Sequence, residues 1–192
     1  AREGAKAREE FFRDHAGLVI EAAQMISICL ARKGKLLLCG NGGSAADAQH
    51  VAAEFVNRFL LERPPLPAIA LSTDSSILTS IGNDYSFEQI FSKQVLALGQ
   101  PGDVLLAIST SGGSPNVLEA IRAARERGLK VIGLTGKDGG KMAGLCDILL
   151  NVQHQSTPAI QEVHLAVEHL ICRLCDYYLF ENVRELMPLL EE

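Results

Sequence analysis

The sequence has no excess of basic residues and no long apolar run. Its 192 residues include 18 Lys and Arg against 23 Asp and Glu, a net charge of −5, which disfavours binding to the phosphate backbone of nucleic acids. No uninterrupted apolar stretch approaches the roughly 20 residues that a membrane helix needs. The first residues, AREGAKAREE, lack the apolar core of a signal peptide. We therefore expect a cytoplasmic protein with neither a nucleic acid nor a membrane as partner.

Two common site signatures are also missing. Cys172 and Cys175 have no second CxxC pair with which to form a zinc ribbon, and the five cysteines are an odd number. Because the cysteines lie in apolar segments, we expect reduced thiols in the core. No Gly-Lys-Ser/Thr follows a glycine-rich turn, which disfavours a nucleoside triphosphatase of the Walker type.

A glycine-rich loop, Gly-Asn-Gly-Gly-Ser at residues 40–44, stands between an apolar run and a helical pattern. This order predicts a strand, a tight loop and a helix start. The loop is either a connector or an anion site, since glycines let N–H groups approach a ligand and the helix dipole points there. His50, Glu54 and Arg58 recur every four residues, so we expect them on one stripe of this helix.

A second loop of this kind follows the apolar run 103–108. The run is typical of a strand buried on both faces, which predicts a parallel sheet. The loop, Ser-Thr-Ser-Gly-Gly-Ser-Pro at residues 109–115, places Ser114 at a helix N-cap. It is either a serine-rich turn or a phosphate cradle. The cradle is favoured because two such loops follow strand carboxyl ends, where ligands bind in open α/β sheets.

Shorter segments complete the expected α/β fold. Further strands are expected over residues 68–71, 130–135 and 147–151. Asp74 can cap a helix over residues 75–81, and residues 87–98 predict another helix.

Helical patterns precede and follow the sheet-forming part of the chain, at residues 2–33 and 159–181. The first segment has more apolar surface than one packing face needs, so part of it is expected at a subunit interface. The second carries Gln161, His164 and His169. Spacing alone does not distinguish a functional histidine from a packing one.

Together, these motifs resemble the sugar isomerase (SIS) domain proteins, and within them the phosphoheptose isomerases. The resemblance covers nearly the whole chain. It rests on CGNGGS at 39–44, His50 with Glu54 and Arg58, GND at 82–84, ISTSG at 108–112, TGKDGG at 135–140, and IQEVH at 160–164 followed by His169. It implies a single SIS domain over residues 1–192, with a five-stranded parallel sheet flanked by helices and with N-terminal and long C-terminal helices. It also implies a homotetramer, with residues 1–33 as the oligomerisation segment.

The resemblance implies an isomerase that converts D-sedoheptulose 7-phosphate to D-glycero-D-manno-heptose 7-phosphate through an enediol, the first step toward the heptose of bacterial lipopolysaccharide. Such a reaction needs a base near the carbons and an acid near the oxygens, and Glu54 and His169 are the implied pair. The implied zinc ligands are His50, Glu54, Gln161 and His169. The implied phosphate contacts are Ser109, Thr110, Ser111 and Ser114. The other implied substrate contacts are Asn41, Gly42, Gly43, Ser44, Glu54, Arg58, Asn83, Asp84 and Gln161.

A second function remains open. A non-catalytic protein of this superfamily, which associates with the replication initiator, also resembles the segments SAADAQH at 44–50 and ERPPLPAIALST at 62–73. That protein lacks the acidic and histidine residues that match Glu54 and His169. Both are present here, which favours the enzyme.

Overall fold

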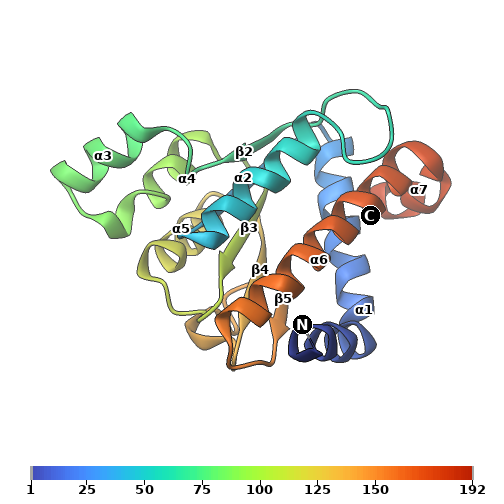
Figure 1. The fold of residues 1–192 in the computed structure, drawn as a ribbon. Helices are drawn as coiled ribbons and strands as arrows, with labels where there is room; N and C mark the ends of the chain where they lie inside the picture. Colours follow the sequence, from blue (N-terminus) through green and yellow to red (C-terminus); the bar gives the residue numbers. More distant parts are fainter. Residues whose placement is uncertain (1, 192) are drawn as a thin grey trace.

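Five parallel strands form the sheet at the centre of the computed structural model, which describes residues 2–191 (Figure 1). The strands are β1 (Leu36–Gly40), β2 (Ala68–Ala70), β3 (Val104–Ser109), β4 (Lys130–Gly136) and β5 (Ile148–Val152), in the spatial order β2-β1-β3-β4-β5. The predicted parallel sheet is confirmed. Because the chain builds outward from β1 on one side and from β3 on the other, the strand order reverses between these two neighbours. Ligands bind at such a reversal in open α/β sheets.

Helices cover both faces of the sheet. They are α1 (Arg2–Ala31), α2 (Gly43–Val56), α3 (Ser75–Asp84), α4 (Ser92–Leu98), α5 (Pro115–Glu126), α6 (Thr157–Asp176) and α7 (Val183–Glu191). Short 3₁₀ turns span Phe87–Gln89 and Gly140–Met142, and a short π-helix at Tyr177–Glu181 follows α6. The predicted helix over residues 87–98 is therefore divided into a 3₁₀ turn and the shorter α4.

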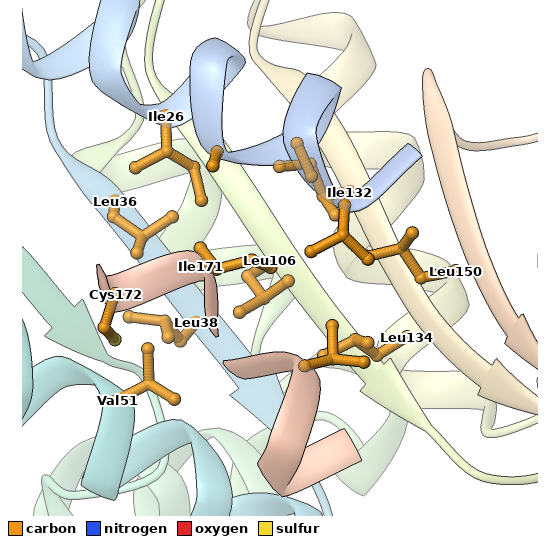
Figure 2. Packing of buried hydrophobic residues seen from close by; sticks show 14 of the residues in the cluster. Ile26, Leu36, Leu38, Val51, Leu106, Ile132, Leu134, Leu150, Ile171 and Cys172 are labelled. Atoms are coloured by element: carbon orange, nitrogen blue, oxygen red, sulfur yellow. The ribbon is translucent and has the colours of Figure 1, made fainter. Parts of the chain in front are cut away.

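The strands bury alternate side chains in two separate apolar layers. Leu36, Leu38 and Leu106 pack with α1, α2 and α6 on one face (Figure 2). Leu37 and Leu105 pack with α4 and α5 on the other face. Every residue of β1 and β3 is buried, which is the double burial that their uninterrupted apolar runs predicted.

The helix α1 is long and apolar enough, by length and composition alone, to cross a membrane. In this fold one side of α1 is part of the core. Val19, Ala22, Ala23 and Ile26 are fully buried with residues of the sheet and α6. The core helix of a globular protein passes the same length and composition test.

The five cysteines are free thiols, and four of them are buried. Cys172 and Cys175 lie on the inner face of α6. Burial raises the pKa of the Cys39 thiol to about 12, which keeps the nucleophilic thiolate form rare. Cys29, Cys39, Cys172 and Cys175 thus lie in the core as expected, whereas Cys146 is half-buried.

Candidate functional site

The two glycine-rich loops lie side by side at the carboxyl edge of the sheet because β1 and β3 are neighbours. A reciprocal pair of amide hydrogen bonds links them. Asn41 Nδ2 donates to Asn116 Oδ1, and Asn116 Nδ2 donates to Asn41 Oδ1, both at 2.8 Å. Asn116 is 2% exposed in the first turn of α5. The sequence analysis missed this residue. The signal that could have indicated it is a polar side chain directly after the Ser-Pro pair that begins the helix.

The loop after β3 gathers three hydroxyl groups. Ser109 Oγ lies 2.9 Å from Ser114 Oγ and 3.5 Å from Ser111 Oγ, and the N–H of Gly113 donates to Ser111 Oγ at 3.2 Å. Ser114 occupies the N-cap of α5, as predicted, but its side chain does not cap the helix. The hydroxyl cluster therefore sits at the positive end of the α5 dipole, where hydroxyl and N–H donors can bind a phosphate. Thr110 is half-buried in the same loop.

This loop is fixed against the loop that follows β4. Gly112 has a φ of 61°, and a Cβ at this position would overlap the carbonyl oxygen of Gly139. Met142 donates its N–H to the Gly112 carbonyl at 3.1 Å. A glycine is therefore required at 112 for both its backbone angle and the close approach of the two loops.

The helices α2 and α6 bring two histidines and a carboxylate together. His50 Nε2 and His169 Nε2 are 2.9 Å apart, while His50 Nδ1 lies 3.7 Å from Glu54 Oε1. The His50 ring thus stands between the other two groups. A hydrogen bond between the two imidazole nitrogens needs one ring to donate and the other to accept. The ring of Phe59 stacks on His169, with centroids 5.3 Å apart.

Gln161 reaches from the start of α6 to the start of α2. A Cβ at Gly43 would overlap Gln161 Nε2, so glycine at position 43 lets the amide lie against the backbone of the first loop. This contact places Gln161 at the same helix N-terminus as Asn41 and Ser44. Ser44 itself is 4% exposed, so its side chain supports the loop from within.

The nitrogen pair fits part of the implied zinc site. Two imidazole nitrogens bound to one tetrahedral zinc stand about 3.3 Å apart. The Nε2 atoms of His50 and His169 would therefore have to move slightly apart to bind the ion. Glu54 faces the other nitrogen of His50 and would have to rotate to join them. Among residues 2–191, no group of three His, Cys, Asp or Glu side chains is gathered to hold a metal.

His164 and His169 occupy different environments on α6. His164 is fully buried, and its Nε2 lies 2.8 Å from the carbonyl oxygen of Thr135. Burial lowers its pKa to about 4. His164 is therefore the packing histidine, whereas His169 contacts His50.

Glu168 on α6 is a buried acid to which the sequence analysis assigned no role. It is 1% exposed, and neither carboxyl oxygen has a hydrogen-bond partner within the described part of the chain. Burial, followed by the nearby charge of Asp47, raises its pKa to about 8. The carboxyl group next to His169 in sequence is thus held in its neutral form at pH 7.

Arg58 does not share the stripe of His50 and Glu54, so that prediction was wrong. The helix α2 ends at Val56, and Arg58 forms an exposed ion pair with Glu62, with Nε and Oε2 3.3 Å apart. In the last turn of α2, the carbonyl groups of Glu54 and Phe55 accept hydrogen bonds from the Arg63 side chain. In a longer helix they would accept from the N–H groups of the next turn.

Asn83 and Asp84 lie at the end of α3, where Asn83 Nδ2 donates to Asp84 Oδ1 at 2.8 Å. Both are exposed. Among the described residues, neither has a hydrogen bond to the histidine pair or to the serine loop, and α3 stands apart from α6 (Figure 1). This chain by itself does not bring them to the site, because α3 packs by Leu78 and Ile81 on the opposite face of the sheet from α6.

Known proteins are similar to this chain in sequence and in fold. A family model described as the SIS domain matches residues 1–136. A phosphoheptose isomerase of Nitratidesulfovibrio vulgaris is 63% identical over 191 residues, which cover 100% of this chain and 92% of the relative. The structure of the phosphoheptose isomerase from Neisseria gonorrhoeae is 50% identical, with a TM-score of 0.87 over 91% of this chain and 94% of that one. The corresponding structure from Francisella tularensis is 42% identical, with a TM-score of 0.88 over 91% and 93%. The chain belongs to the SIS domain family and, within it, to the phosphoheptose isomerases.

Proposed function

We propose that the protein interconverts D-sedoheptulose 7-phosphate and D-glycero-D-manno-heptose 7-phosphate through an enediol. The observation that carries the proposal is the series Glu54, His50 and His169, which joins a carboxylate and two imidazoles across α2 and α6. The names of relatives that match over 91% to 100% of the chain support it.

The residues suit the proton movements of this reaction. A base removes a proton from C1 of the ketose, and the C2 carbonyl oxygen takes up a proton to give the enediol. Return of a proton to C2 and loss of the O1 proton then give the aldose. We assign the carbon-bound proton to Glu54, whose side chain is 20% exposed, and the oxygen-bound protons to His169. The two approach from different helices, so a base and an acid can act at adjacent atoms.

The phosphate is assigned to the loop after β3. The hydroxyl groups of Ser111 and Ser114 lie 3.5 Å and 2.9 Å from that of Ser109 at the start of α5, and Thr110 completes the loop. The first loop, with Asn41, Gly42 and Gly43, is tied beside it by the pair of amide hydrogen bonds with Asn116. The sugar chain is therefore assigned to the space between the two loops and Gln161.

We also propose that zinc binds at the histidine pair. His50 and His169 would hold it through Nε2, with Glu54 and Gln161 completing the set after side-chain rotation. When bound, the ion would polarise the sugar carbonyl. Chelation should then lower activity and added zinc should restore it, while calorimetry with zinc alone should show loss of binding in His50→Ala.

The proposal includes a homotetramer in the cytoplasm. Exposed apolar side chains on the outer surfaces of α1 and α6 support it, because Ile20, Leu165 and Leu170 are 41%, 38% and 36% exposed in the single chain. Such surfaces are commonly buried between subunits.

The proposed function is tested by incubating the purified protein with D-sedoheptulose 7-phosphate and following the sugar by carbon-13 NMR. Appearance of the aldose signal supports the isomerase. Unchanged sugar together with binding to the replication initiator would support the non-catalytic alternative instead.

A further inference from the structure

Arg63 is a charged side chain buried where α2 ends. It is 3% exposed, although Pro64 and Pro65, which follow it, are exposed. Its guanidinium forms an ion pair with Asp176 on α6, which is 2% exposed, with Nε and Oδ1 3.0 Å apart. A charge this deeply buried is costly unless its hydrogen-bond donors are satisfied.

The other donors of Arg63 bind the last carbonyl groups of α2. One terminal nitrogen donates to the carbonyl oxygen of Glu54 at 2.8 Å, and the other donates to that of Phe55 at 2.6 Å. The second nitrogen also lies 3.2 Å from the carbonyl oxygen of Asn57. The final carbonyl groups of a helix lack partners within the helix and form the negative end of its dipole. The guanidinium therefore closes α2 both by hydrogen bonding and by charge.

These contacts join the two helices that carry the proposed catalytic pair. The backbone carbonyl of Glu54 accepts a hydrogen bond from Arg63, and Asp176 lies about two helical turns beyond His169 on α6. We propose that Arg63 is a positioning residue, which holds Glu54 in place relative to His169 through Asp176 and the end of α2. This inference rests on the proposed function.

The geometry requires an arginine. A planar guanidinium points its donors toward Asp176 and toward two backbone carbonyls at once. A lysine ammonium keeps the charge opposite Asp176 but does not span both carbonyl groups. Arg63→Lys should therefore keep the ion pair while freeing the end of α2.

The test compares kcat, KM and Tm of the wild type, Arg63→Lys, Arg63→Met, and the double variant Arg63→Met/Asp176→Leu. Arg63→Met leaves a buried carboxylate unpaired and should lower Tm by about 10 °C. Removal of both charges is often neutral for stability, so the double variant should recover much of that loss. We expect kcat to fall about 10²-fold in both Arg63→Lys and the double variant, with KM nearly unchanged, because a small displacement of a catalytic group has a cost of this order.

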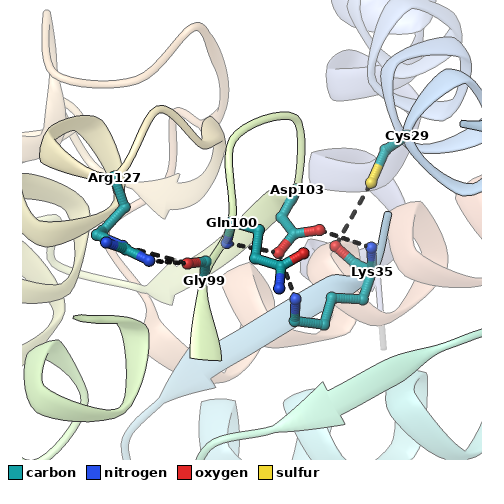
Figure 3. Close-up of polar contacts among 6 residues, drawn as sticks. All are labelled: Cys29, Lys35, Gly99, Gln100, Asp103 and Arg127. Carbon is teal, nitrogen blue, oxygen red and sulfur yellow. Dashed lines mark hydrogen bonds and ion pairs between the residues drawn. The ribbon is translucent and has the colours of Figure 1, made fainter. Parts of the chain in front are cut away.

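A second buried carboxylate, paired with the partly exposed Lys35, supplies the control. Asp103 is 2% exposed and accepts hydrogen bonds from Lys35 Nζ at 2.6 Å and from the N–H of Gln100 at 2.9 Å (Figure 3). It precedes β3, at the opposite edge of the sheet from the site. Asp103→Asn should lower Tm as a broken buried pair does, and leave kcat unchanged.

Two results would overturn the inference. The first is a wild-type kcat in Arg63→Lys and in the double variant. The second is an absence of change in the imidazole proton–nitrogen NMR signals of His50 and His169 in both variants, a measurement that does not depend on catalysis. We expect these signals to shift in both variants and to stay in place in Asp103→Asn. If the wild type left the sugar unchanged, the proposed function would fail, and unmoved imidazole signals would still refute a positioning role for Arg63.

Discussion

His50 and His169 face each other through their Nε2 atoms, 2.9 Å apart, with Glu54 3.7 Å from the other nitrogen of His50. A carboxylate and an imidazole from α2 thus lie next to an imidazole from α6, although the two helices are far apart in sequence. Glu54 and His169 have distinct roles in the proposed reaction, so single substitutions should separate their effects.

Glu54→Gln should lower kcat by about 10²–10⁴-fold with KM nearly unchanged, because the amide keeps the size of the side chain and loses its basicity. Steady-state kinetics with D-sedoheptulose 7-phosphate measures the effect. Glu62→Gln is the matched control, since Glu62 is exposed and is not among the residues assigned to the site. Turnover close to that of the wild type in Glu54→Gln would contradict the assignment.

Replacing Ser111 and Ser114 together with Ala should raise KM about 10²-fold, because two hydrogen bonds to a charged phosphate are lost. Ser111 is exposed and Ser114 is half-buried, so Tm should change little. The effect should be absent for the unphosphorylated sugar. Ser80→Ala, which removes an exposed hydroxyl on α3, controls for the loss of a hydroxyl group. An equal loss with both sugars would mean that the loop is only structural.

Acidification should destabilise the protein through His164. Its pKa is about 4 in the folded chain, against an ordinary value of 6.5, because the ring is buried and its Nδ1 has no partner among the described residues. The unfolded chain therefore binds a proton that the folded chain excludes as the pH falls below 6.5. The resulting loss in the free energy of unfolding is negligible well above pH 6.5 and is about 2 kcal/mol at pH 5.

The variant His164→Gln isolates the acid-induced loss of stability that His164 causes, since glutamine can still donate to the Thr135 carbonyl and does not titrate. Thermal unfolding at pH 7.5 and pH 5 should show a smaller acid-induced fall in Tm for His164→Gln than for the wild type. Its kcat should match the wild type, because His164 is buried away from His50. An identical pH dependence in both proteins would show that another group controls acid stability.

The exposed leucines of α6 should lie in a subunit interface. Light scattering at micromolar concentration should return four times the chain mass of 20.7 kDa. Leu165→Glu/Leu170→Glu should give a smaller species, since two carboxylates would be buried without partners. Leu98→Glu, on the exposed end of α4, should leave the assembly intact. A wild-type mass near that of one chain would contradict the interface.

The sheet and most helix starts were predictable because their causes are local. The apolar run over 103–108 predicted a strand buried on both faces, and Asp74 caps α3 by accepting from the Ile77 N–H at 2.9 Å. The end of α2 was not predictable from its own residues. It depends on Arg63, whose partner Asp176 is distant in sequence.

The same distinction divides the candidate site. The spacing of His50 and Glu54 predicted that they share a helix face, which the structure confirms. The contact of His50 with His169, the burial of Glu168 and the link between Asn41 and Asn116 arise from tertiary packing between separate elements. Spacing within one segment carries no information on such contacts.

Exchange of carbon-bound hydrogen with solvent tests the proposed isomerisation most directly. D-Sedoheptulose 7-phosphate incubated with the wild type in D₂O should form the aldose and acquire deuterium at C1 of the ketose and C2 of the aldose, as followed by NMR. His164→Gln should exchange at the wild-type rate, and Glu54→Gln about 10²-fold or more slowly. Aldose formed without deuterium after many turnovers would contradict the enediol, and neither exchange nor aldose would contradict the isomerase itself.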